Sequence, residues 1–224
     1  MSADRTSPVA VSSGTVPTDG TSPVGGPPAP EPALAELVRA DGAVSGPARA
    51  AEFRAFLEAD GGVMHRDGGP RHLTASAIVV DRGGDHVALV WHRKGRFWVQ
   101  PGGHVDSDET SFEQAARREV AEEIGLEGLE RVGHGPAMLH RHGLDAAFGR
   151  CAEHWDVQFL LRAQAPAAEL PLRVSEESGK VRWFPWPLRG AGPARDTDAL
   201  PPGTVPDLPA TLDLLAPYLA RRSG

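Results

Sequence analysis

Three glutamates lie close together in one short segment: Glu119, Glu122 and Glu123. Positions three and four apart share one face of an α-helix, so the three carboxylates converge if this segment is helical. Carboxylates that close repel one another unless a cation lies among them, and their hard oxygen atoms suit Mg²⁺ or Mn²⁺. Arg118 is placed to steady one of them through a bidentate pair. These residues predict a divalent-metal site, with a solvated acidic helix face as the alternative.

The segment around these glutamates carries the signals of a helix from Thr110 to Gly125. Thr110 and Glu113 have the spacing of a capping box, and Gly125 suits the left-handed residue at which helices commonly end. The preceding loop begins with Pro101-Gly102-Gly103, where glycines let the backbone approach a ligand or metal. The buried face of the helix is predicted from an apolar stripe at helical spacing, formed by Phe112, Ala115, Ala116, Val120 and Ile124.

Read together, the loop and the helix resemble the Nudix box, G-x5-E-x7-R-E-U-x-E-E-x-G-U, in which U is a bulky aliphatic residue. The matching residues are Gly103, Glu109, Arg118, Glu119, Val120, Glu122, Glu123, Gly125 and Leu126. The sequence departs from the box at one point, because eight residues rather than seven separate Glu109 from Arg118. An extra residue in the loop or in the first helical turn would absorb this difference. The direction in which the Glu109 carboxylate points is left open.

The resemblance covers about residues 72 to 190 and implies an α/β fold, the Nudix-type α/β/α sandwich with a mixed β-sheet. It also implies a metal-dependent pyrophosphohydrolase that cleaves a phosphoanhydride in a nucleoside diphosphate linked to another group. By position, Glu119, Glu122 and Glu123 resemble metal ligands, one of which could also orient or deprotonate water. Gly103 resembles a carbonyl ligand, and Arg118 resembles the residue that orients a ligand glutamate. The implied cofactor is Mg²⁺ (or Mn²⁺).

Candidates for substrate binding come just before the glycine loop: Arg93, Lys94, Arg96 and Trp98. The three cations could hold a distal phosphate, or could simply end a strand in solvent. The Trp98 indole could stack on a base or pack in the core.

Two further groups of residues have chemistry-bearing side chains. Glu176 and Glu177 come where some relatives carry an additional carboxylate that acts as a base, although an ordinary acidic loop is the alternative. His140, His142 and His154 with Asp156 have the residue types of a second metal site. Their irregular spacing favours a structural or exposed role.

The elements that must position these residues follow from periodicity and from turn signals. The predicted strands are Leu73–Val80, His86–His92, Phe97–Gln100, Leu129–Gly133, Trp155–Ala163 and Lys180–Trp186, the first two forming a hairpin. A last helix is predicted from Leu208 to about Arg221. Residues 1–31 are predicted to be disordered, residues 32–70 to form an N-terminal helical extension, and residues 71–224 to form the Nudix domain. Two helices are expected in the extension. The first runs from about Pro32 to Ala40, and the second starts after Ser45-Gly46-Pro47 and stops at Gly61-Gly62.

Composition argues against several classes of protein. The chain of 224 residues is 40% hydrophobic and carries a net charge of −7 without a long basic run, which argues against a nucleic-acid partner. No apolar stretch reaches the length of a membrane helix, and no signal peptide is recognised, so a cytoplasmic protein without a membrane partner is expected. The single cysteine, Cys151, excludes an internal disulfide and a thiolate metal cluster.

Two alternatives use the same scaffold. A Nudix-fold isomerase acting on a diphosphate would rely on a reactive cysteine, and Cys151 lies outside any recognised pattern. A non-catalytic nucleotide-binding module would usually lack some of the box glutamates, which are all present here. The sequence predicts a small nucleotide-like substrate without identifying it. The general base, the number of metal ions and the oligomeric state stay open, a homodimer being one expectation.

Overall fold

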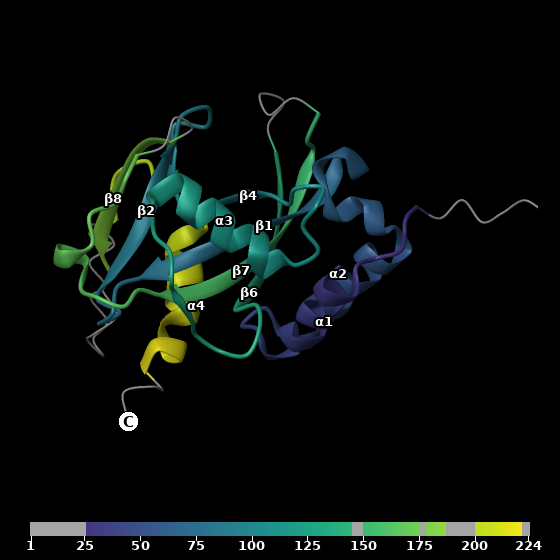
Figure 1. Ribbon diagram of the computed structural model, residues 1–224, viewed down its shortest axis with the longest axis horizontal. Helices are drawn as coiled ribbons and strands as arrows, with labels where there is room; N and C mark the ends of the chain where they lie inside the picture. The colour runs from purple at the N-terminus through teal and green to yellow at the C-terminus, as the bar shows by residue number, and fades with distance from the viewer. Residues whose placement is uncertain (1–25, 145–149, 175–177, 187–199, 221–224) are drawn as a thin grey trace, which may run out of the picture.

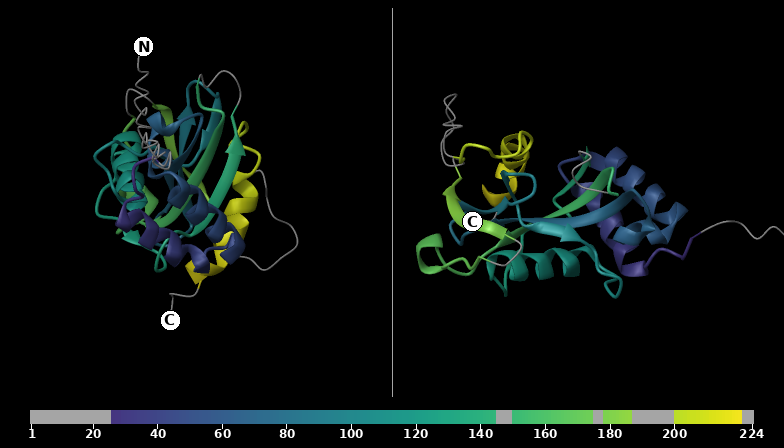
Figure 2. Two further views of the ribbon diagram at one scale, coloured as in Figure 1. Left: turned by 90° about the vertical axis from the view of Figure 1, so that its right-hand side faces the viewer. Right: turned by 90° about the horizontal axis from the view of Figure 1, so that it is seen from above.

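The computed structural model describes residues 26–144, 150–174, 178–186 and 200–220. One mixed sheet forms the middle layer, and helices cover both of its faces (Figures 1 and 2). The strands are β1 Arg71–Val80, β2 His86–His92, β3 Phe97–Val99, β4 Gly102–His104, β5 Glu130–Arg131, β6 Met138–Gly143, β7 Glu153–Arg162 and β8 Ser178–Pro185. The α-helices are α1 Glu31–Arg39, α2 Gly46–Ala59, α3 Phe112–Ile124 and α4 Leu208–Ala220. This architecture confirms the predicted α/β fold class.

Strand β1 is the centre of the sheet. It pairs in parallel with β7 over its whole length, from Arg71↔Glu153 to Val80↔Arg162. Its pairing with β2 is antiparallel and is confined to the turn end, at Val79↔Ala88 and Val80↔Val87. The predicted hairpin is therefore present but short. At its other end β1 pairs with β4 in the antiparallel direction.

The side chains of β1 alternate between two hydrophobic cores, as the period of a strand requires. Leu73, Ala75, Ala77 and Val79 belong to the core under α3, which also contains Phe112, Val120 and Ile124. Ile78 and Val80 belong to the core under α4, together with Leu212 and Leu215. The sheet is thus buried on both faces.

Helices α1 and α2 lie at one end of the sheet and share the core under α3 (Figure 2). Leu37, Phe53 and Leu57 are completely buried in it. The chain leading into α1 is also attached, because the backbone N–H of Gly61 donates to the carbonyl of Pro27 at 2.8 Å. The expected helices of the extension are therefore present, whereas residues 1–25 lie outside the described residues.

Two strands were not predicted. The run Gly102–His104 forms β4 although its glycines disfavour strands. Strand β6 is mostly polar and half exposed, so it lacks a clear hydrophobic alternation. Within the described residues, none of the helices combines the length and the apolar character needed to cross a membrane.

Candidate functional site

Helix α3 begins later than the sequence indicates. Its N-cap is Ser111, whose hydroxyl accepts a hydrogen bond from the backbone N–H of Gln114. Glu113 does not turn back toward the N-cap, because its carboxylate pairs with Arg117 and Arg131 instead. The capping box predicted at Thr110 is therefore wrong. The left-handed C-cap at Gly125, with φ of 72°, is confirmed.

The carboxylate of Glu36, on α1, supplies most of the N-terminal capping of α3. Its two oxygens accept hydrogen bonds from the Ser111 hydroxyl at 2.6 Å and from the backbone N–H groups of Phe112 at 2.7 Å and Glu113 at 3.3 Å. The side chain is only 4% exposed. Burial raises the pKa of Glu36, while the three donors act in the opposite direction. A negative group at this place also complements the positive end of the helix dipole.

Glu109 points into the site despite the extra residue that follows it. Its carboxylate accepts a fork of two hydrogen bonds from Arg118, from Nε at 3.1 Å and from Nη2 at 3.2 Å. The backbone N–H of Asp106 donates to the same carboxylate at 2.8 Å, and only 4% of Glu109 is exposed. The late start of α3 thus places the extra residue in the loop, where it leaves the Glu109–Arg118 pair intact.

The remaining donors of Arg118 join the glutamate face to β4. Nη1 donates to Glu119 at 3.0 Å and to Glu122 at 2.9 Å, and Nη2 also donates to the backbone carbonyl of His104 at 2.8 Å. Burial acts to lower the pKa of Arg118, but the carboxylates of Glu109 and Glu119 outweigh it and raise the pKa of the guanidinium above its usual value. Arg118 thus contacts two glutamates of α3 and the backbone of β4 at once.

The two glycines of β4 permit its close approach to α3. A Cβ atom at Gly103 would lie 2.5 Å from the Glu119 carboxylate, so no other residue fits there without a shift. Gly102 has φ of 155°, and its backbone N–H donates to the Glu123 carboxylate at 2.9 Å. Backbone and carboxylates therefore meet along this edge of α3.

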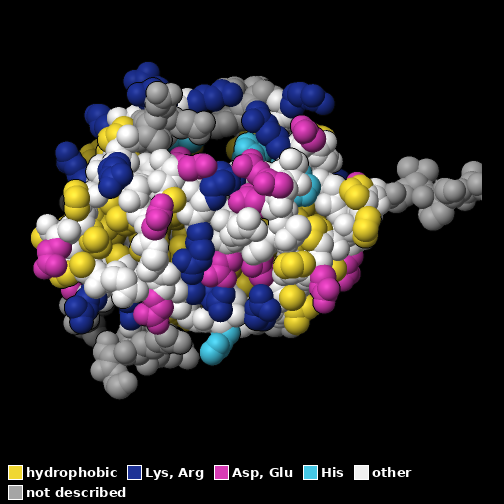
Figure 3. Space-filling view, in the orientation of Figure 1, with side chains coloured by type: hydrophobic (Ala, Val, Ile, Leu, Met, Phe, Trp, Pro, Cys, Tyr) yellow, Lys and Arg dark blue, Asp and Glu magenta, His cyan; other side chains and the backbone are white. Residues whose placement is uncertain are grey.

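The charge balance of this face fits a bound divalent cation. Arg118 is within 4.0 Å of four carboxylates, and Glu123 on helix α3 adds a fifth, so several carboxylates share this guanidinium. Carboxylate and backbone oxygens are the donors that Mg²⁺ prefers. The carboxylates concerned are Asp106, Glu109, Glu119, Glu122 and Glu123. On the face of the molecule that carries α3, acidic, basic and histidine side chains gather around a hollow (Figure 3).

The residues predicted to bind substrate separate into two groups. Arg93, Lys94 and Arg96 are exposed in the turn between β2 and β3, where they are accessible to a phosphate. Trp98 is only 8% exposed and packs edge-on against Trp91 and Phe184 in the core under α4. This placement supports the packing alternative for Trp98. Glu176 and Glu177 lie outside the described residues.

The histidine set suggested by residue type is in partial contact, because the His142 ring stacks on His140 and meets His154 edge-on. His140 pairs with Asp207 at 3.3 Å. The Asp156 carboxylate, 4% exposed, accepts hydrogen bonds from Thr74 and Ser76 on the neighbouring strand. Only His154 takes part in a compact group of possible metal ligands, and its companions there are His72, His104 and Cys151. The parallel pairing of β1 with β7 brings this group together, which sequence spacing alone does not reveal.

Comparisons with known proteins agree with this fold. The family model described as the NUDIX domain matches residues 70–196. Among solved structures, the chain is similar to a C. elegans Ap4A hydrolase in a binary complex, with 19% identity, a TM-score of 0.50 and coverage of 66% of this chain and 98% of that chain. It is also similar to a MutT NUDIX hydrolase from Burkholderia pseudomallei, with 24% identity, a TM-score of 0.45 and coverage of 65% and 98%. No curated protein matches the chain. The first of these structures shares the fold described above.

Proposed function

We propose a specific activity for this chain, which belongs to the Nudix family and is a hydrolase of phosphoanhydride bonds. The activity is the metal-dependent cleavage of a pyrophosphate linkage in a nucleoside diphosphate joined to another group. The observation that carries the proposal is the Arg118 fork, which gathers Glu109, Glu119 and Glu122 beside the β4 backbone. An acidic face that was only solvated would not need a buried carboxylate and a shared guanidinium to hold it in place.

The proposed metal ligands are Glu119, Glu122 and Glu123 with the backbone carbonyl of Gly103. When bound, Mg²⁺ or Mn²⁺ would offset the negative charge of the non-bridging phosphate oxygens. Arg118 holds Glu119 and Glu122 in fixed directions, so the ligands are organised before the cation arrives. Gly102 does the same for Glu123 through its backbone N–H.

The chemical step requires water to attack one phosphorus atom while the bridging oxygen leaves with the other phosphate. One P–O–P bond breaks, one P–O bond forms, and a proton passes from water to a carboxylate. A glutamate on this face is the proposed acceptor of that proton. Arg93, Lys94 and Arg96 are proposed to hold a more distant phosphate of the substrate, because they are exposed cations on the β2–β3 turn.

The position of Cys151 argues against the isomerase alternative. Successive residues of a strand point to opposite faces, and Gly103 faces Glu119 while the His104 side chain contacts Cys151 at 3.8 Å. The thiol therefore lies on the other side of β4 from the glutamates. It does not share a pocket face with the proposed metal site.

A panel of nucleotide substrates tests the proposal. Purified protein is incubated with Mg²⁺ and with nucleoside triphosphates, dinucleotides and nucleotide sugars. The products are separated by liquid chromatography, because cleavage of a dinucleotide or a nucleotide sugar yields two phosphomonoesters and no free phosphate. We expect turnover of at least one class, and we expect Glu123→Gln to abolish most of it. Absence of turnover across the panel, or equal turnover by the variant, would count against the proposed activity.

A further inference from the structure

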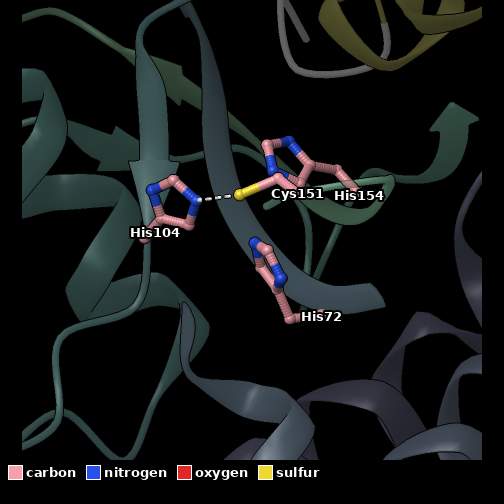
Figure 4. Close-up of side chains that lie close together, drawn as sticks. All are labelled: His72, His104, Cys151 and His154. Carbon is pink, nitrogen blue, oxygen red and sulfur yellow. Dashed lines mark hydrogen bonds between the residues drawn. The ribbon is translucent and has the colours of Figure 1, made fainter. Parts of the chain in front are cut away.

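Four side chains from distant parts of the chain converge next to β4: His72, His104, Cys151 and His154. Together they form the His₃Cys cluster. Their possible ligand atoms all lie within 4.8 Å of one another. Figure 4 shows the three imidazole rings around the Cys151 sulfur, approaching it from different sides. The cluster is built from β1, β4, β7 and the residues just before β7.

The sheet register holds these side chains together. His72 lies directly opposite His154 in the β1–β7 pairing, and His104 lies opposite Thr74 in the β1–β4 pairing. The backbone N–H of Ala152 donates to the carbonyl of Pro70 at 2.7 Å, which anchors the segment that carries Cys151. The cluster is thus a fixed feature of the fold and does not depend on flexible surface side chains.

His72 is oriented in the way that a metal-binding histidine is. Its Nδ1 lies 2.9 Å from the carbonyl of Gly69, which can only accept a hydrogen bond, so Nδ1 carries the proton. Its Nε2 then has a free lone pair, yet this atom is buried and has no hydrogen-bond partner. The residue as a whole is 0% exposed. A backbone carbonyl behind one ring nitrogen is a common arrangement for a histidine whose other nitrogen binds a metal.

His154 also has a ring nitrogen without a hydrogen-bond partner. Its Nε2 is also buried without a hydrogen-bond partner. A polar atom that is buried and unpaired lowers stability, and proteins rarely leave two such atoms side by side. The rings of His72 and His154 have their centroids 4.9 Å apart. A single bound cation among them would satisfy both nitrogens.

The distances and ligand types indicate which metal fits. Two ligands on a tetrahedral Zn²⁺, one nitrogen and one sulfur, are expected about 3.6 Å apart. The observed distance between Cys151 Sγ and His104 Nε2 is 3.8 Å. Movements of about 1 Å would bring the farthest pair within range of a zinc ion. Imidazole and thiolate ligands suit Zn²⁺ and are poor ligands for Mg²⁺, which prefers oxygen.

We propose that His72, His104, Cys151 and His154 form a structural Zn²⁺ site, separate from the glutamate face. Four protein ligands close the coordination shell, as in other structural zinc sites. The ion would fasten the short strand β4 to β1 and β7. Because the carbonyl of His104 accepts a hydrogen bond from Arg118, the site would also support the position of the Arg118 fork.

Metal binding by the intact protein tests this proposal without relying on activity. The protein is stripped of metal, then titrated with Zn²⁺ and separately with Co²⁺, in buffer containing excess Mg²⁺. We expect one Zn²⁺ per chain by elemental analysis. We also expect Co²⁺ to give the visible absorption of a tetrahedral ion together with a thiolate-to-cobalt charge-transfer band. Failure to retain Zn²⁺, or a cobalt spectrum without the thiolate band, would overturn the proposal.

Variants separate this cluster from the other histidines. Cys151→Ser and His72→Asn should each weaken Zn²⁺ binding by at least about 100-fold, since each removes one of four ligands. His140→Asn is the matched control, because His140 pairs with Asp207 outside the cluster, and it should bind Zn²⁺ as the parent does. Circular dichroism of each metal-free variant identifies any that fail to fold. If Cys151→Ser unfolds, the cobalt charge-transfer band of the parent and the His140→Asn result still decide the question. Parent-like binding by a folded Cys151→Ser variant would contradict the assignment.

Discussion

The backbone carbonyl of His104 lies 2.8 Å from Nη2 of Arg118 and accepts its hydrogen bond. His104 therefore contacts the glutamate face through its backbone, while its side chain belongs to the His₃Cys cluster on the other side of β4. One residue of a three-residue strand connects the two groups. We therefore expect the geometry of Arg118 to matter as well as its charge.

Replacing Arg118 by lysine should reduce turnover by about 10–100-fold, the usual effect of losing a residue that orients metal ligands. An ammonium group keeps the charge but cannot reach Glu109, Glu119 and the His104 carbonyl at once. Arg117→Lys is the matched control, because Arg117 pairs with Glu113 and with the Leu129 carbonyl away from this face. Steady-state kinetics at saturating Mg²⁺ compares the two. Equal losses of turnover in both variants would show that the effect is not specific to the contacts of Arg118.

Glu122→Gln and Glu123→Gln should each lower turnover by about two orders of magnitude, which corresponds to roughly 3 kcal/mol in the transition state. Each change keeps the shape of the side chain but removes a charged ligand for a hard cation. Without Mg²⁺, the melting temperature should hold or rise, because crowded like charges become fewer. Glu127→Gln, an exposed residue just after α3, should retain parent activity. If both variants turn over normally, the face is only solvated surface. If they lose folding together with activity, the two glutamates are structural.

Removal of Mg²⁺ from the zinc-saturated protein should abolish turnover, and Mg²⁺ or Mn²⁺ should restore it. The reason is the surplus of carboxylates around Arg118. Saturating the protein with zinc first keeps the His₃Cys cluster out of the comparison. Substrate hydrolysis is followed during a Mg²⁺ titration. Undiminished turnover with no free divalent cation would contradict the assignment of the glutamate face.

Glu36→Ala should destabilise the fold by about 1–3 kcal/mol, since it leaves the part-buried hydroxyl of Ser111 and the buried N–H of Phe112 without their acceptor. The matched control is Glu58→Ala, an exposed glutamate on α2, which should change stability by about 0.5 kcal/mol or less. Urea denaturation of both variants measures the difference. Equal stability of Glu36→Ala and the parent would mean that Glu36 does not act as the cap.

Deletion of residues 1–25 should leave both the melting temperature and turnover unchanged. Deletion through Pro30 should instead lower stability by about 0.5–1.5 kcal/mol, because it removes the hydrogen bond between the Pro27 carbonyl and the Gly61 N–H. Thermal unfolding of the two truncated proteins tests this boundary. A large loss of stability on removing only residues 1–25 would show that this segment contributes to the fold.

The sequence predicts features that depend on local spacing. The buried stripe of α3 and its C-cap at Gly125 repeat or end at helical intervals, and the structure has both. Glu119 and Glu122 also meet on this helix, at the Arg118 guanidinium. Features that depend on contacts between distant segments cannot be predicted from local spacing. The cap from Glu36 depends on how α1 packs against α3, and the contact between His72 and His154 depends on the register of two parallel strands. Strand β4 could not be predicted, because glycine residues are unfavourable in strands. Its two glycines instead allow the backbone to come close to Glu119 and Glu123.

The cap contributed by Glu36 also determines which segments must stay together when this enzyme is truncated or recombined with relatives. The family match begins at residue 70, well after Glu36, and ends at residue 196, before α4. A recombinant fragment cut to those limits would expose the first turn of α3 at one end of the sheet and the apolar side chains under α4 on its other face. Chimaeras that exchange the glutamate-bearing helix between relatives would need to carry α1 with it. In this chain the structural unit around α3 therefore extends beyond the residues that the family model matches.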